Sequence, residues 1–137
     1  MTKDEIIDLI KDAGYGVLAT CEDIQPKARP MMPYLDEEGN LLLAVLSHSR
    51  TISQIKKNPL VEMCYVDRKM NFARISGQAK ISSDLEKKQI VWNNIAMLRQ
   101  FFTGVEDPNF VLIQIDTTTV EAMTPRQKQP DRINFKD

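Results

Sequence analysis

Hydrophobic residues recur at helical spacing near the start of the chain. Residues 3–13 place isoleucine and leucine side chains at i, i+3 and i+4, which predicts an amphipathic helix. Thr2 and Glu5 have the spacing of a capping box at its start, and Gly14 is suited to end it.

Two later segments also carry helix signals. Residues 49–59 place apolar side chains on one face behind Ser49, which suits an N-cap. Ser83 with Glu86 gives a second capping-box pattern and predicts a helix over 84–98.

Short apolar or alternating runs bounded by turn residues predict the strands. They occupy residues 16–21, 26–35, 41–46, 60–66, 71–82, 110–115 and 118–123, and the last two segments form one or two strands. Three prolines within 26–35 indicate a bulged or edge strand, and Gly77 predicts a bulge or sharp bend in the long 71–82 strand.

The order of these elements predicts a mainly β fold with flanking helices. Most strands follow one another through hairpins, which argues against a doubly wound parallel sheet. About six antiparallel strands, one of them bent, close best as a small barrel. We expect residues 1–137 to form a single domain, with 125–137 as a polar, loosely held tail.

Composition and charge exclude several classes of function. The 18 basic and 19 acidic residues give a net charge of -1, without the basic excess of a nucleic-acid-binding protein. The longest apolar run, 41–46, is too short to span a membrane. Cys21 and Cys64 fit reduced thiols in a cytoplasmic protein, and one histidine makes a histidine-rich metal site unfavourable.

The residues from Lys27 to Thr51 suggest an anion site. Lys27 and Arg29 lie at i, i+2 and share one side of a strand. The short helix after Ser49 would offer free N–H donors, with Arg50 and Thr51 in its first turn. The alternative is that Lys27 and Arg29 are solvated and Ser49 only caps the helix.

No catalytic constellation is visible in the chain. His48 has no acidic partner nearby in sequence, and the acidic run 36–38 fits a solvated hairpin tip. Core packing accounts for the cysteines. Trp92 could pack on the barrel, face a second subunit or contact an aromatic ligand.

Several weak motifs occur together in an order typical of one family. They are Gly16-Val17-Leu18-Ala19-Thr20, Pro26-Lys27-Ala28-Arg29-Pro30-Met31, Gly39-Asn40-Leu41, Ser49-Arg50-Thr51, Asn58-Pro59-Leu60-Val61, Ala73-Arg74-Ile75-Ser76-Gly77 and Asp107-Pro108. Over residues 3–123 the chain resembles the pyridoxamine 5'-phosphate oxidase-like, FMN-binding split-barrel proteins, and in particular their general-stress-protein branch.

The resemblance implies a six-stranded antiparallel split β-barrel that forms a homodimer with FMN at the subunit interface. Arg29 and the Ser49-Arg50-Thr51 turn would bind the phosphate. Backbone around Met31 and around Val45-Leu46 would line the isoalloxazine ring. Trp92 would approach from the partner subunit.

The function that this resemblance implies is that of an FMN-dependent oxidoreductase of unknown substrate and electron donor. The chain has no Gly-x-Gly-x-x-Gly fingerprint for a nicotinamide dinucleotide. The alternatives are a non-catalytic flavin-storage or sensing module, and a split barrel that binds deazaflavin or haem instead.

Overall fold

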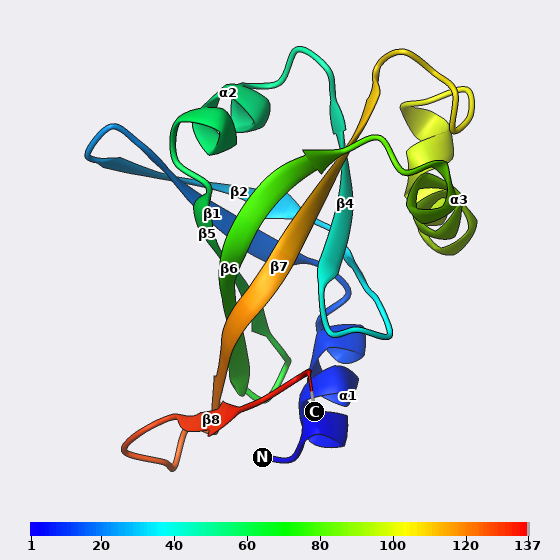
Figure 1. Ribbon diagram of the computed structural model, residues 1–137. Helices are drawn as coiled ribbons and strands as arrows, with labels where there is room; N and C mark the ends of the chain where they lie inside the picture. Colours follow the sequence, from blue (N-terminus) through cyan, green and yellow to red (C-terminus); the bar gives the residue numbers. More distant parts are fainter. Residues whose placement is uncertain (137) are drawn as a thin grey trace.

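The computed structural model describes residues 1–136, which form one antiparallel sheet with helices around it (Figure 1). The strands are β1 (Gly16–Glu22), β2 (Gln25–Met31), β3 (Tyr34–Leu35), β4 (Leu41–Leu46), β5 (Leu60–Val66), β6 (Phe72–Ser82), β7 (Phe110–Met123) and β8 (Asp131–Ile133). The helices are α1 (Lys3–Ala13), α2 (Arg50–Lys57), α3 (Leu85–Asn94) and the short 3-10 helix η1 (Ala96–Gln100).

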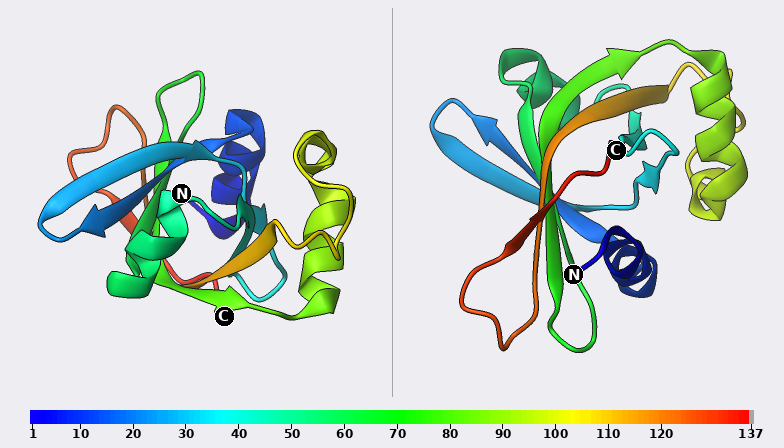
Figure 2. Two further views of the ribbon diagram at one scale, coloured as in Figure 1. Left: turned by 90° about the horizontal axis from the view of Figure 1, so that it is seen from above. Right: turned by 60° about the horizontal axis from the view of Figure 1, so that its bottom comes forward.

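The sheet is a barrel that stays open along one seam. Its strand order is β2-β1-β5-β6-β7-β4-β3, with β8 added to β7, so β2 and β3 lie at the two ends of this order. The long strands β6 and β7 curve strongly, and the β1–β2 hairpin projects from the body (Figures 1 and 2). The predicted antiparallel split barrel is therefore confirmed, with two short strands, β3 and β8, beyond the predicted six.

The sequence predicts a bulge or sharp bend at Gly77 of β6, and the sheet is irregular there, but the extra residue lies on β7. Ser76 pairs with Thr119 and Gly77 pairs with Thr117, so Thr118 of β7 has no partner on β6. A Cβ atom added at Gly77 would lie 2.4 Å from the carbonyl oxygen of Asp116 on β7. Glycine is thus required here because the two backbones approach too closely for a side chain.

Two hydrophobic cores share strand β4. Leu41, Leu43 and Val45 point into the barrel, where they join the main core. Leu42 belongs to a second core, formed with Val91 of α3 and residues of η1 and β7. Because both faces of β4 are covered, its sequence is a continuous apolar run rather than an alternating one.

The helix boundaries confirm one capping box and correct the other. Thr2 and Glu5 form the predicted box on α1, and Gly14 ends the helix at a positive φ of 78°. At α3, however, Asp84 is the N-cap and its carboxylate accepts from two backbone N–H groups, so the Ser83 box is wrong. The helix predicted over 84–98 breaks at Ile95, where α3 gives way to η1.

One strand prediction needs correction, and one open alternative is resolved. The predicted strand 26–35 is interrupted at Met32-Pro33 and forms the separate strands β2 and β3. Residues 110–123, for which the sequence allows one or two strands, form one continuous strand, paired with both β4 and β6.

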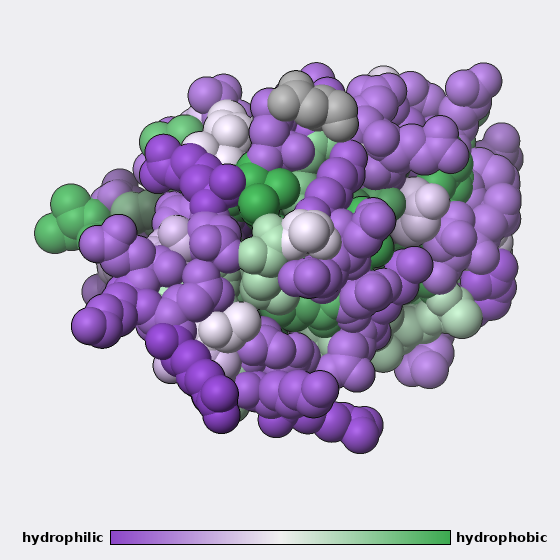
Figure 3. Space-filling view, turned by 90° about the horizontal axis from the view of Figure 1, so that it is seen from below, coloured by the Kyte–Doolittle hydropathy of each residue, from purple (hydrophilic) through white to green (hydrophobic). Residues whose placement is uncertain are grey.

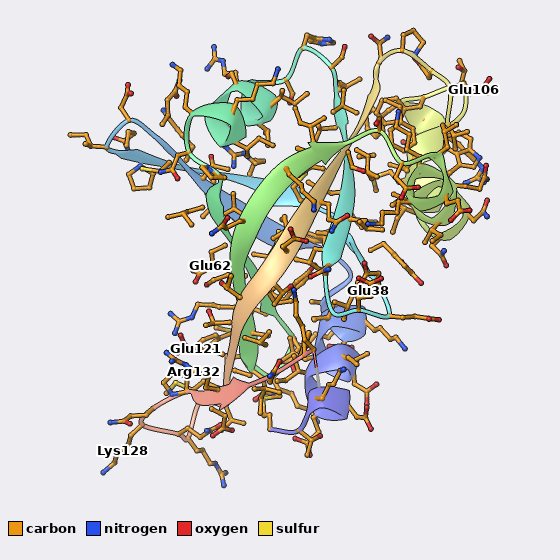
Figure 4. The ribbon with its side chains drawn as sticks, viewed as in Figure 1. Glu38, Glu62, Glu106, Glu121, Lys128 and Arg132 are labelled. Carbon is orange, nitrogen blue, oxygen red and sulfur yellow. The ribbon has the colours of Figure 1, made fainter. Side chains whose placement is uncertain are left out.

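The prediction of a loosely held C-terminal tail is wrong for residues 125–136. β8 pairs with β7, and Glu121 of β7 lies beside Arg132 of β8 (Figure 4). Phe135 is 2% exposed and belongs to the main core. Lys3 donates to the carbonyl of Phe135 at 2.8 Å, and the N-terminal ammonium contacts the Asp131 carboxylate. Asp137 lies outside the described residues.

Polar side chains dominate the face on which the N-terminus and the C-terminal segment lie. Apolar surface is visible among these polar side chains in the middle of that face (Figure 3). Within residues 1–136, no helix is long and apolar enough to cross a membrane.

Candidate functional site

A large pocket lies at the open seam of the barrel, between the end of β2 and strand β4. Its volume is about 680 Å³, which is in the range of small-molecule sites. The lining residues are Tyr15, Pro30, Met31, Met32, Leu43, Ala44, Val45, Leu46, Ser49, Thr51, Ile95, Met97, Leu98, Phe101 and Phe102. No charged side chain is among them, so this is an apolar slot with hydroxyl groups from Tyr15, Ser49 and Thr51.

The sheet topology explains why the slot exists. On its outer side β4 pairs with β3 only at Leu41 and Leu42. No strand of the described chain covers the rest of that edge, from Leu43 to Leu46. The edge therefore presents backbone N–H and C=O groups to whatever fills the slot.

Ser49 is the most informative residue of the slot. It occupies the N-cap position of α2, as the sequence predicts, but its side chain makes no capping hydrogen bond. Its Oγ atom is buried and has no hydrogen-bond partner among residues 1–136. A buried hydroxyl without a partner is costly, which indicates that a ligand or water normally satisfies it.

The first turn of α2 adds to the suitability of this end of the slot for an anion. The first N–H groups of a helix have no partner within the helix, and the helix dipole gives them a partial positive charge. The first turn of α2 contains no acidic residue, and Thr51 in that turn also lines the slot. Backbone donors and two hydroxyl groups thus converge on one end of the slot.

Arg29 does not line the slot, and its side chain contacts β1 and α2 instead. Its guanidinium donates to the carbonyl of Leu18 at 3.1 Å, to Oγ1 of Thr20 at 2.9 Å and to Oε1 of Gln54. Thr20 and Gln54 are both buried, and Thr20 also donates to Gln54 at 2.7 Å. Partial burial lowers the pKa of Arg29. The guanidinium is therefore fixed between β1 and α2 by protein acceptors.

The structure brings together some of the predicted site residues and separates others. Met31, Val45, Leu46, Ser49 and Thr51 all line the slot. Lys27, Arg29, Arg50 and Trp92 do not.

Those other positions differ in what they contact. Lys27 and Arg50 are exposed, and neither makes an ion pair within the described chain. Trp92 packs on the second core, with the guanidinium of Arg99 4.6 Å from its ring centre. Whether any of the nine residues contacts a cofactor stays a prediction.

Sequence reasoning missed one whole wall of the slot. Ile95, Met97, Leu98, Phe101 and Phe102 form it, from η1 and the residues on either side. Their spacing in the sequence predicts only the end of a helix. No local sequence signal indicates that this segment turns toward β4.

The weaker chemical candidates are placed away from the slot. His48 is exposed in the turn before α2. Burial raises the pKa of the Cys64 thiol, which disfavours a reactive thiolate. Asp36 accepts from the N–H groups of Glu38 and Asn40, as expected of a hairpin tip. Within residues 1–136, no three His, Cys, Asp or Glu side chains are grouped as a metal site would require.

The open barrel and its seam pocket define the class of protein as an antiparallel split barrel. Residues 1–127 match the family described as "Pyridoxamine 5'-phosphate oxidase like", and the chain belongs to that family. The match confirms the family expected from the sequence motifs.

Individual relatives agree with this assignment. The chain is 24% identical to General stress protein 26 of Bacillus subtilis (strain 168), over 93% of this chain and 92% of the relative. The crystal structure of General Stress Protein 26 from Bacillus anthracis str. Sterne has a TM-score of 0.80 at 30% identity, covering 96% of each chain.

Two more distant structures share the fold and differ in the ligand that their names give. One is a pyridoxamine 5'-phosphate oxidase-related, FMN-binding protein from Nostoc punctiforme, with a TM-score of 0.73, 20% identity and coverage of 95% and 88%. The other is a heme binding protein from Mycobacterium smegmatis, with a TM-score of 0.76, 14% identity and coverage of 93% and 55%.

Proposed function

We propose that the chain binds FMN in the seam pocket and acts as an FMN-dependent oxidoreductase. The observation that carries the proposal is the buried, unpartnered Oγ of Ser49 at the start of α2, beside an apolar slot. FMN has the matching composition, since it combines a phosphate with a large flat ring. Membership of the family and the FMN-binding relative support the same cofactor.

Different residues of the chain would bind the phosphate and the ring of FMN. Ser49, Thr51 and the first N–H groups of α2 would donate to the phosphate, with each charge-assisted bond contributing about 1.5–3 kcal/mol. Arg50, exposed at the first position of α2, is free to add a charge. Met31 and the open edge of β4 would hold the ring and exclude water from it. FMN, when bound, supplies the hydride or electron transfer.

A second copy of the chain is part of the proposal. Tyr15, Met97 and Phe101 line the slot, yet they are exposed by 59%, 46% and 56%. A homodimer that covers these side chains would close the slot over the ring, and Trp92 of each copy would lie near the shared boundary. Light scattering coupled to size-exclusion chromatography tests the dimer, and a monomer at micromolar concentration would contradict it.

The decisive experiment is an FMN titration of the purified chain, followed by quenching of flavin fluorescence. Ser49→Ala removes the unpartnered hydroxyl and should weaken FMN binding about tenfold, the equivalent of one charge-assisted hydrogen bond. Thermal stability should not fall, since Ser49 makes no capping bond. The matched control is Ser53→Ala on the same helix, whose hydroxyl donates to the carbonyl of Arg50 outside the slot.

Haem is the second candidate cofactor, favoured by the haem-binding relative. His48, the chain's one histidine, is exposed and does not line the slot, so FMN fits the pocket better. The visible spectrum of the isolated protein separates the two, since haem gives a Soret band and FMN gives flavin bands. Bleaching of bound flavin by NAD(P)H would distinguish an enzyme from a storage or sensing module.

A further inference from the structure

A second cavity lies beside the seam pocket, under helix α1. Its volume is about 430 Å³, and it runs between α1 and the segment Met32–Glu37. Ile7 and Ile10 of α1 form one wall, and Met32, Pro33 and Leu35 form the other. We call this cavity the α1 groove. It shares Met32 and Ile95 with the seam pocket, so the two spaces are neighbours.

Tyr65 is the buried residue of the α1 groove. The side chain is 2% exposed, and its ring is so close to Gly16 that a Cβ there would lie 2.9 Å from a ring carbon. Its hydroxyl is buried and has no hydrogen-bond partner among residues 1–136. Such a group costs about 1–3 kcal/mol unless something else satisfies it. Burial also raises the pKa of Tyr65, so the hydroxyl stays protonated and can donate.

The charges at the rim of the α1 groove restrict the kind of ligand. The rim carries one basic residue, Lys11, and two acidic residues, Asp36 and Glu37, and this excess of negative charge disfavours anions. One oxygen of Asp36 already accepts from the N–H groups of Glu38 and Asn40. The walls are apolar, and the Tyr65 hydroxyl requires an acceptor. These features together select a neutral, largely apolar molecule that carries an acceptor oxygen.

We propose that the α1 groove binds a small neutral ring compound whose carbonyl oxygen accepts a hydrogen bond from the Tyr65 hydroxyl. The shared residues Met32 and Ile95 place such a molecule next to the proposed flavin pocket, in the position of a co-substrate. Its role as co-substrate rests on the proposed function, whereas its binding to the groove does not.

The test uses 2-methyl-1,4-naphthoquinone, a neutral ring compound with two carbonyl groups, added to the full chain without FMN. Isothermal titration calorimetry should show saturable binding. Tyr65→Phe should weaken this binding about fivefold, as expected for the loss of one neutral hydrogen bond, without lowering the melting temperature. No binding, unchanged affinity in Tyr65→Phe or a lower melting temperature in that variant would each overturn the proposal.

A matched ligand and a second variant sharpen the result. 2-Methylnaphthalene lacks the carbonyl groups, so its affinity should be the same for the parent chain and Tyr65→Phe. Ile7→Trp should fill the groove and abolish quinone binding, because Ile7 lines the groove and is not part of either hydrophobic core. Ile90→Trp, on a partly exposed position of α3 outside the groove, should leave quinone binding unchanged. Equal loss in the two tryptophan variants would overturn the proposal.

FMN titrations of the same variants separate this inference from the proposed function. Quinone binding that depends on Tyr65 in a chain that fails to bind FMN would sustain the groove and refute the flavin site. FMN binding without quinone binding would refute the groove alone. Binding of a second copy of the chain in the groove would exclude the quinone, and that result also overturns the proposal.

Discussion

Two polar residues near α2 make contacts that their positions in the sequence do not reveal. The sequence predicts Ser49 as a helix cap and a phosphate-binding residue, and in the structure its hydroxyl makes no capping bond and is unpartnered in the seam pocket. Arg29 reads as a free cation on an edge strand, yet Leu18, Thr20 and Gln54 accept from its guanidinium. The partners of Arg29 come from β1 and α2, and local spacing carries no information about such contacts.

Arg29→Ala should therefore affect folding as well as binding. Its removal leaves the buried oxygens of Thr20 and Gln54 with one donor fewer, so the free energy of unfolding should fall by about 1–3 kcal/mol. FMN affinity should fall too, because α2 loses its tie to β2. Urea unfolding measures the first effect and FMN titration the second.

Arg50→Ala provides the comparison for Arg29. Arg50 is exposed and makes no ion pair among residues 1–136. Its removal should weaken FMN binding and leave the free energy of unfolding within about 0.5 kcal/mol. Equal stability losses in the two arginine variants would contradict the structural role assigned to Arg29.

At the scale of elements, the shape of the barrel depends on the register shift between β6 and β7, where β7 carries one extra residue, Thr118. The register shift at Gly77 allows β6 and β7 to curve together over their full length. The sequence shows this feature directly, because a lone glycine inside a long β-prone segment is typical of a bulge or of a close approach between backbones.

Gly77→Ala should be strongly destabilising. The new methyl group would lie 2.4 Å from a backbone oxygen and 2.7 Å from the Ile115 side chain, and the backbone contact cannot be relieved by a rotamer change. We expect a loss of about 3 kcal/mol or more in urea unfolding, at the upper end of the costs of overpacking. Gly104→Ala meets nothing within 4 Å, and its unfolding free energy should stay within about 0.5 kcal/mol of the parent.

Elements and their order were largely accessible from the sequence, whereas their junctions were not. Caps, turns and apolar periods are local signals, and they placed α1, β1, β4 and β5 well. The break at Ile95 follows from packing of η1 on the second core, which joins residues distant in sequence. The slot wall from Ile95 to Phe102 was missed for the same reason.

At the scale of the whole molecule, the two ends of the chain are tied together. Phe135 fills space beside Gly39, where an added Cβ would lie 2.9 Å from the Cβ of Phe135. A single aromatic residue in a polar segment gives no periodic signal, so the sequence reads as a loose tail. Lys3 and the N-terminal ammonium hold the same segment from the side of α1.

The contact between the N-terminal ammonium and the Asp131 carboxylate should depend on pH. Hydrogen bonds from the N-terminal ammonium and from Gln127 lower the pKa of Asp131 below its ordinary value of 3.8. Its stabilising contribution is therefore complete above pH 3.8 and is lost as the pH falls through the lowered pKa. Asp131→Asn should melt below the parent at pH 7, and the difference should shrink toward zero under strongly acidic conditions.

Thermal melts of both proteins across this pH range provide the measurement. Glu106→Gln, on an exposed side chain of a distant loop, should show no such pH-dependent difference (Figure 4). A gap between parent and Asp131→Asn that stays constant down to low pH would show that the contact is not ionic.

The hydroxyl of Ser49, at the start of α2, has no partner among residues 1–136. A ligand in the slot that satisfies it would therefore also stabilise the fold. A ligand that binds only the native chain raises the unfolding free energy by RT ln(1 + [L]/Kd), about 2.7 kcal/mol at a hundredfold excess over Kd. The protein without ligand would thus be the less stable form, and the supply of the ligand would set how long each molecule lasts.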